Sequence, residues 1–174
     1  MDESAFQQAM DAALRYLSPR PRSVWEVQQR LKRRGLAPED IDAVISRLRE
    51  LGYLDDDSFA AFWIENRESF QPRGRRLLAQ ELRLRGVDTQ AIEERLSAID
   101  EEDGAMRAAR KKAQGLSGAG YAAFTARVGS FLQRRGFSYD VITPATRRLW
   151  AEVALSSPEG DSYHEKGEGE EDQD

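Results

Sequence analysis

Three pairs of apolar residues recur along the chain with the spacing of one helix face. The pairs are Val27 and Leu31, Leu78 and Leu82, and Val128 and Leu132. Residues four positions apart lie above one another on a helix, so each pair predicts a buried stripe. A glycine follows each pair, at positions 35, 86 and 136. The pattern is therefore a threefold internal repeat of about 50 residues.

The repeated glycines predict where these helices end. A left-handed residue just after a helix is most easily a glycine, and the residue after it packs back onto the last turn. Around Gly86, for example, Leu82 and Val87 are the two apolar residues that such a cap brings together. Pro144 falls about six residues into the last expected helix, where it predicts a kink or a later start.

Each repeat contains a first helix, a basic second helix that ends at the glycine, and a third helix. The first helices are expected at about 4–17, 58–69 and 102–114. No run alternates between apolar and polar residues as a half-buried strand does. The sequence predicts an all-α fold of three tandem three-helix repeats, at 1–55, 56–101 and 102–155, in an elongated, solenoid-like array.

Charge is distributed unevenly along the chain. The net charge is −5, but residues 156–174 alone hold eight acidic residues and one lysine, with no aliphatic side chain. This composition predicts a disordered acidic tail. The remaining body is mildly basic, and its arginines are bunched near the repeated glycines.

The composition leaves little material for catalysis. The chain has no cysteine and one histidine, His164, which excludes thiol catalysis, zinc fingers and iron–sulfur ligation. We find no nucleophile with a base, no metal-ligand set and no phosphate-binding loop, so we expect no enzyme activity, cofactor or metal. The three aspartates at 55–57 could suggest a metal site. A helix N-terminus is the better interpretation, because three consecutive aspartates do not have the ligand spacing of a calcium-binding loop.

No segment predicts membrane insertion or export. The longest apolar run is residues 60–64, whereas a spanning helix needs roughly 20 residues. The N-terminal segment MDESAFQQAM is acidic rather than basic and then apolar. We expect a cytoplasmic protein without a membrane association, and we expect it to act as a monomer.

Three segments resemble the signatures of the RecX family, bacterial regulators of the RecA recombinase. They are GYLDDDSFAAFWIENR at 52–67, GRRLLAQELRLRGV at 74–87 and LQRRGFSYDVI at 132–142, within a resemblance that covers about residues 4–150. The resemblance implies binding to RecA or its nucleoprotein filament, with inhibition of the ATPase, recombination and coprotease activities. It also implies a role in DNA repair, recombination and the SOS response.

Ten basic residues are candidates for contacts with RecA or DNA. Seven lie near the ends of the second helices: Lys32, Arg33, Arg34, Arg83, Arg85, Arg134 and Arg135. Cations at a helix C-terminus are favoured by the helix dipole in any case, so their position alone does not indicate binding. Arg73, Arg75 and Arg76 instead stand at a helix start, where a cation costs about 0.3–1 kcal/mol, so they are the strongest candidates.

The basic residues suit an extended polyanionic partner, because each contact is weak and several must add. Such a partner is either the acidic wall of a filament groove or the phosphates of single- or double-stranded DNA. The alternative function is a stand-alone DNA-binding protein, since three-helix units with a basic helix also describe helix-turn-helix proteins. The acidic tail is best interpreted as a solubilising segment; a further hypothesis is that it folds onto the basic residues and competes with DNA.

Overall fold

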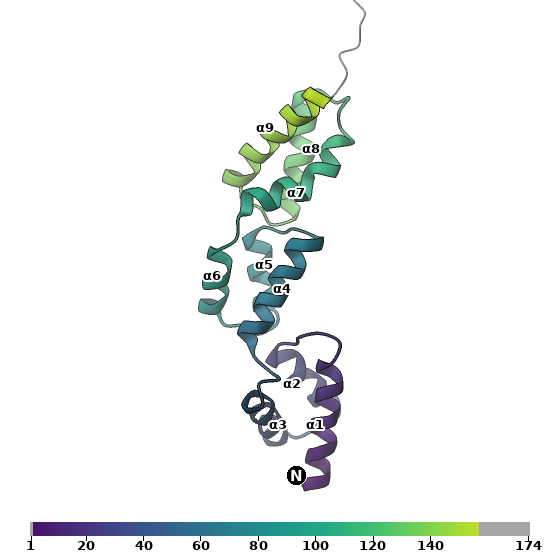
Figure 1. Cartoon of the computed structure of the whole chain (residues 1–174), viewed down its shortest axis with the longest axis vertical. Coiled ribbons are helices and arrows are strands. Elements are labelled where there is room, and N and C mark those ends of the chain that lie inside the picture. The colour runs from purple at the N-terminus through teal and green to yellow at the C-terminus, as the bar shows by residue number, and fades with distance from the viewer. Residues whose placement is uncertain (1, 157–174) are drawn as a thin grey trace, which may run out of the picture.

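The computed structural model describes residues 2–156, which form helices and no strand. The helices are α1 (Glu3–Leu17), α2 (Val24–Lys32), α3 (Pro38–Glu50), α4 (Asp56–Phe70), α5 (Arg75–Arg83), α6 (Thr89–Ser97), α7 (Glu101–Gln114), α8 (Tyr121–Arg134) and α9 (Tyr139–Ser156). Figure 1 shows them in three groups, α1–α3, α4–α6 and α7–α9, which follow one another along the longest axis of the molecule. The predicted all-α fold of three tandem three-helix units is confirmed. Apart from Ser156, the last residue of α9, the predicted acidic tail lies outside the described residues.

Each group of three helices encloses a hydrophobic core of its own. The six residues of the repeated stripes, two in each of α2, α5 and α8, are all fully buried. They belong to three separate clusters of buried side chains, one for each group. Burying one such side chain contributes about 1.5–3 kcal/mol, so the stripes hold each three-helix unit together. Within the described residues, none of the helices is both long and apolar enough to cross a lipid bilayer.

All three repeated glycines adopt the predicted left-handed conformation, and the second and third caps also have the backbone bond that returns to the last helical turn. Gly35, Gly86 and Gly136 have φ angles of 84°, 76° and 87°. The Val87 N–H donates to the Leu82 carbonyl at 3.2 Å, and the same bond recurs at Phe137 in the third repeat. Gly52, with φ of 73°, ends α3 in the same way, because the Tyr53 N–H donates to the Leu48 carbonyl. The three-repeat pattern did not indicate this fourth cap.

The second helices of the three units meet end to end. Trp25 in the first turn of α2 lies against Gly86, which follows α5. Leu77 in the first turn of α5 lies against Gly136, which follows α8. At this second joint the Gly74 N–H, at the start of α5, donates to the carbonyl of Arg135 at 2.9 Å. The repeated glycines therefore serve as helix caps and also as contact points between units.

The three aspartates at 55–57 lie at the start of α4, as expected for a capping role. The Asp55 side chain accepts from the N–H of Ser58 at 2.8 Å, which confirms it as the N-cap. Asp56 reaches into the first unit and accepts from the Val24 N–H at 2.8 Å. Asp57 forms an ion pair with Arg95 of α6. The last helix begins at Tyr139 and continues through Pro144 to Ser156, so it does not start later.

Candidate partner-binding surface

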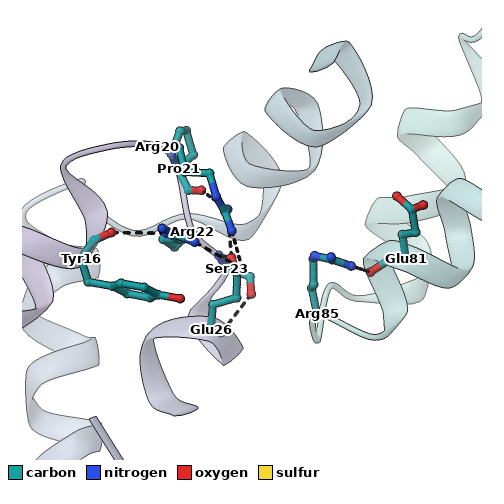
Figure 2. A network of polar contacts seen from close by, with 8 residues as sticks. All are labelled: Tyr16, Arg20, Pro21, Arg22, Ser23, Glu26, Glu81 and Arg85. Atoms are coloured by element: carbon teal, nitrogen blue, oxygen red, sulfur yellow. Dashed lines mark hydrogen bonds and ion pairs between the residues drawn. The ribbon is translucent and has the colours of Figure 1, made fainter. Parts of the chain in front are cut away.

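The first unit presents arginines that are held by a tyrosine and a glutamate. The guanidinium of Arg22 lies 4.2 Å from the centre of the Tyr16 ring, and that of Arg30 lies 5.6 Å from it. Glu26, which forms a capping box with Ser23 at the start of α2, receives Nη2 of Arg20 at 2.7 Å. Figure 2 shows Tyr16, Arg20, Arg22, Ser23 and Glu26 with the hydrogen bonds and ion pairs between them. Burial alone would raise the pKa of Glu26, but the hydrogen bonds and charges around it outweigh burial and lower it.

The ring of Trp63 on α4 contacts the guanidinium groups of three arginines, one of which belongs to the first unit. The guanidinium carbons of Arg85, Arg67 and Arg20 lie 3.8, 4.4 and 6.0 Å from the ring centre. A cation over a tryptophan ring gains roughly 0.5–2 kcal/mol, depending on how far it is desolvated. Because Arg20 also pairs with Glu26, Trp63 connects the arginines of the first unit with those of the second.

Glu81 is the buried anion of the second unit. It is only 8% exposed, and its carboxylate accepts from Nε1 of Trp63 at 2.7 Å and from Nε of Arg67 at 3.1 Å. Arg73 forms a close ion pair with the same carboxylate, and Arg85 donates to the Glu81 backbone carbonyl at 2.7 Å. A buried carboxylate is tolerated only when it is paired and hydrogen-bonded in this way. Glu81 therefore fixes the positions of several surrounding arginines.

Arg135 extends the arrangement into the third unit. Its guanidinium lies 4.6 Å from the centre of the Phe131 ring and donates to the carbonyl of Pro72 at 3.4 Å. The pKa of Arg73 is lowered by burial and then by the nearby charges of Arg67, Arg135 and Arg85, so the charges of the second and third units act on one another. We call the connected set the arginine row. It consists of Arg20, Arg22, Arg30, Arg67, Arg73, Arg85 and Arg135.

The arginine row retains an excess of positive charge. Four of its seven guanidinium groups form ion pairs, and they share two carboxylates, those of Glu26 and Glu81. Burial, followed by the charges of Arg67 and Arg20, lowers the pKa of Arg85, although the charge of Glu26 opposes this shift. An arginine stays protonated at neutral pH even so. The row is thus a surface on which anions of a partner would relieve unfavourable contacts between like charges.

A second basic surface lies between α5 and α6. It is an open groove of about 430 Å³. Ala79, Ile92 and Leu96 supply its apolar lining, and Arg75, Arg76, Arg83, Glu93 and Ser97 supply its polar lining. We call it the α5/α6 groove. The three arginine side chains belong to exposed residues, unlike those of the arginine row, which are mostly half-buried.

The ten sequence candidates separate into three places. Arg73, Arg85 and Arg135 belong to the arginine row. Arg75, Arg76 and Arg83 line the α5/α6 groove. Lys32, Arg33, Arg34 and Arg134 are exposed at helix ends outside both surfaces.

The reason for favouring Arg73 and Arg75 needs correction. The sequence argument assumed that no nearby group offsets their position at a helix start. The structure shows that Arg73 pairs with Glu81 and Arg75 with Glu101, whose carboxylate also accepts from the Arg75 N–H at 2.8 Å. Their placement therefore does not by itself indicate a binding role. Arg76 is held less tightly, by a bond of 3.4 Å to the carbonyl of Gln133.

The sequence candidates did not include Arg20, Arg22, Arg30 and Arg67. Two local signals could have identified part of the row. Arg67 follows Trp63 by four positions, which places this pair on one helix face, and Arg85 follows Glu81 by four positions, in the turn that ends α5. No local signal connects Arg20 with Trp63, because that contact forms only when the first two units pack together.

Family models match the chain in three consecutive segments. They are the first, second and third three-helix domains of RecX, at residues 9–48, 55–96 and 100–145. The regulatory protein RecX of Thermobifida fusca is 32% identical over 164 residues, covering 90% of this chain and 89% of that protein. The regulatory protein RecX of Bacillus subtilis is 36% identical over 149 residues. That match covers 82% of this chain and 55% of the relative, so the chain spans about half the length of the Bacillus protein.

Two solved structures share the fold. A crystal structure of RecX from Lactobacillus salivarius superposes with a TM-score of 0.74 at 24% identity, covering 83% of this chain and 96% of that one. A crystal structure described as regulatory protein RecX gives 0.72 at 21% identity, covering 84% and 80%. At these identities the two structures support the arrangement of helices.

Proposed function

The chain belongs to the RecX family of regulatory proteins, and we propose that it binds the RecA recombinase or its nucleoprotein filament and inhibits it. The proposed effects are a lower ATPase rate, less recombination and less coprotease activity, with the protein acting as a cytoplasmic monomer. The observation that carries the proposal is the arginine row, which connects all three units. A regulator of a filament needs such an extended surface rather than a single pocket.

The energetics favour many small contacts along a fixed support. An exposed ion pair contributes only about 0–1 kcal/mol, so a useful affinity requires several pairs at once. The arginines of the row are already held by Tyr16, Trp63 and Glu81, which reduces the side-chain entropy lost on binding. The helices that meet end to end hold the units in sequence, so the row is presented as one surface.

The charges of α3 and α6, the third helices of the first two units, argue against the alternative of a stand-alone helix-turn-helix protein. In that mode the later helix of each unit enters the DNA groove. The first turn of α3 carries Glu39 and Asp40, and α6 carries Glu93 and Glu94. Carboxylates at these positions would face phosphates and weaken binding. Direct contact with DNA stays part of the proposal only as an addition to the contact with RecA.

The test is the DNA-dependent ATPase rate of the cognate RecA on single-stranded DNA, with this protein titrated in. The variant for the row combines Arg20→Gln, Arg22→Gln and Arg30→Gln. The matched control combines Arg15→Gln, Arg47→Gln and Arg49→Gln, three exposed arginines of the same unit outside the row. Helical content of both variants is checked by circular dichroism.

We expect the wild type and the control to inhibit at similar concentrations. The row variant should need about ten times more protein, because three contacts of roughly 0.5 kcal/mol each are lost. Equal inhibition by both folded variants would remove the arginine row from the mechanism. Absence of inhibition by the wild type, together with tight binding to bare DNA, would favour the DNA-binding alternative.

A further inference from the structure

The third unit has an open groove of about 430 Å³ between α8 and α9, which pack against each other (Figure 1). We call it the α8/α9 groove. Its α8 side is formed by residues that recur every four positions, and they therefore make one stripe along the helix: Tyr121, Thr125, Gly129 and Gln133. All four are exposed or half-buried, so a ligand can reach them. The twelve residues from the first to the last of them span about 18 Å.

An exposed tyrosine stands at each end of the α8/α9 groove. Tyr121 begins α8 and is 51% exposed, and its ring makes a T-shaped contact with Trp150, with 5.5 Å between the ring centres. Tyr139 begins α9 and is 68% exposed, and its hydroxyl accepts from Nε2 of Gln133 at 2.8 Å. Both rings are thus held by a neighbouring side chain and still present a large part of their surface to solvent.

Three arginines give the groove a positive charge. Arg147 lines it from α9. Arg127 and Arg134 stand three residues before and four residues after Ser130, which lines it from α8, so they lie on the same side of the helix as this edge of the groove. All three arginines are exposed, and none of them forms an ion pair with another described residue. Their charges are therefore available to a ligand.

Carboxylates oppose this charge only weakly. None of the described residues that line the α8/α9 groove is acidic, whereas Glu93 lines the α5/α6 groove. Asp140 follows Tyr139 without lining the groove, and a hydrogen bond from the Ser138 side chain lowers its pKa. Glu152, farther along α9, pairs with Arg110 of α7. The groove therefore combines an excess of cations with two exposed rings.

This combination is typical of surfaces that bind unpaired nucleotides. We propose that the α8/α9 groove binds single-stranded DNA, with bases stacked on the two tyrosines and phosphates paired with the three arginines. Every base has a π face, so we expect this binding to be independent of sequence. The inference goes beyond the contact with RecA, because it gives the DNA strand itself a place on the third unit.

Two other ligands fit the groove less well. Double-stranded DNA keeps its bases stacked inside the duplex, so it gains nothing from the exposed tyrosine rings. An amphipathic helix of a protein needs an apolar surface to cover, but Ile142, the largest aliphatic residue of the lining, is only 5% exposed. Unpaired bases need neither an open duplex nor an aliphatic stripe.

Photocrosslinking of the full chain to single-stranded DNA, without RecA, tests the inference. The oligonucleotide carries 5-iododeoxyuridine, which crosslinks to aromatic side chains that it stacks on, and the crosslinked peptides are identified by mass spectrometry. Affinity for a labelled oligonucleotide is measured by fluorescence anisotropy at several salt concentrations. One double variant, Tyr121→Ala with Tyr139→Ala, removes the rings, and a second, Tyr121→Phe with Tyr139→Phe, keeps them. The matched control Tyr53→Ala changes a tyrosine that is 58% exposed outside the third unit.

We expect crosslinks at Tyr121 and Tyr139. The double alanine variant should bind at least about tenfold more weakly, because two stacking contacts are lost, while the phenylalanine variant and the control should bind as the wild type does. Arg147→Gln should reduce the slope of log affinity against log salt concentration by about 0.7, the value for one phosphate contact of a single strand. Crosslinks confined to other units, equal affinity of the alanine variant and the wild type, or an equal loss in the phenylalanine variant would each overturn the inference.

The ATPase rate of RecA, measured with the same variants, separates the inference from the proposed function. If the wild type inhibits RecA but does not crosslink through the two tyrosines, the groove assignment is wrong and the regulation of RecA stands. If the crosslinks form and RecA is not inhibited, the groove assignment stands and the proposed function fails. If the alanine variant binds single-stranded DNA normally but no longer inhibits RecA, the groove contacts protein, and the inference is overturned.

Discussion

Substituting the repeated glycines by alanine should distinguish two losses of stability. One comes from the left-handed backbone of the helix cap, and the other comes from steric overlap where two units meet. Gly35 and Gly136 have nearly the same φ, 84° and 87°. At Gly35 an added Cβ would meet nothing within 4 Å, whereas at Gly136 it would lie 2.4 Å from the Leu77 Cβ. The two substitutions therefore have the same backbone strain and differ only in whether the added Cβ overlaps with a neighbouring unit.

The expected magnitudes follow from these contacts. A left-handed conformation costs an alanine roughly 1–2 kcal/mol, so Gly35→Ala should destabilise its unit by about that amount. Carbon atoms normally approach to about 3.5–4.0 Å, so at Gly136 the joint must open by more than 1 Å. Overpacking of this kind adds roughly 1–3 kcal/mol, which gives about 2–5 kcal/mol in total for Gly136→Ala.

Hydrogen exchange measured by mass spectrometry is the suitable assay, because it reports stability separately for each unit. Urea titration followed by circular dichroism gives the overall change. We expect Gly136→Ala to increase exchange in α5 and α8 together and to break the bond from Gly74 to the Arg135 carbonyl. Gly35→Ala should affect only α2 and α3. Equal effects of the two substitutions, each confined to its own unit, would refute the assignment of Gly136 as a joint.

Three further measurements test other contacts of the structure. Glu81→Gln should lower the free energy of unfolding by about 2 kcal/mol in urea titrations, since hydrogen bonds to a charged group are lost, whereas the exposed control Glu65→Gln should change it by less than about 0.5 kcal/mol. Burial raises the pKa of Asp56, which means that its charged form is disfavoured in the fold. Asp56→Asn keeps an acceptor for the Val24 N–H and should therefore match or exceed the wild-type stability at pH 7, whereas Asp56→Ala should lose about 1 kcal/mol. A destabilised asparagine variant would contradict this account. The folded-state pKa of Glu26 is lowered, so its carboxylate stabilises the fold at pH values above the ordinary carboxyl pKa of about 4.3. This stabilisation is lost as the pH falls through the lowered folded-state pKa. A Glu26→Gln variant that unfolds in acid with the same profile as the wild type would show that Glu26 makes no such contribution.

The fold could be predicted because its signals are local. The i, i+4 stripes and the glycines at 35, 86 and 136 each act within a few residues, and they recur three times, so each repeat supports the others. The burial of every stripe residue follows from this spacing alone. The same local reasoning placed Asp55 correctly at the start of α4, where its side chain accepts from the Ser58 N–H.

The candidate surface was less predictable because its contacts join distant parts of the chain. Arg73 pairs with Glu81 eight residues later, and Arg75 with Glu101 twenty-six residues later, so neither partner could be recognised from neighbouring residues. Arg20 contacts Trp63 only because the first two units pack together. Glu81, the single acidic residue of helix α5, was the clearest unused signal, since a buried carboxylate requires cations nearby.

The two joints between the units differ in the hydrogen bonds and ion pairs that cross them. This difference determines where the molecule should bend. The joint between α5 and α8 has a backbone hydrogen bond. Two ion pairs also cross from the second unit to the third: Arg75 with Glu101, and Glu68 with Arg107. The joint between α2 and α5 relies on the Trp25 contact, the bond to Asp56 and the Arg20 contact. Bending at the second joint would break more hydrogen bonds than bending at the first. We therefore expect the last two units to move as one stiff body, and the first joint to act as the hinge when the molecule follows a curved partner.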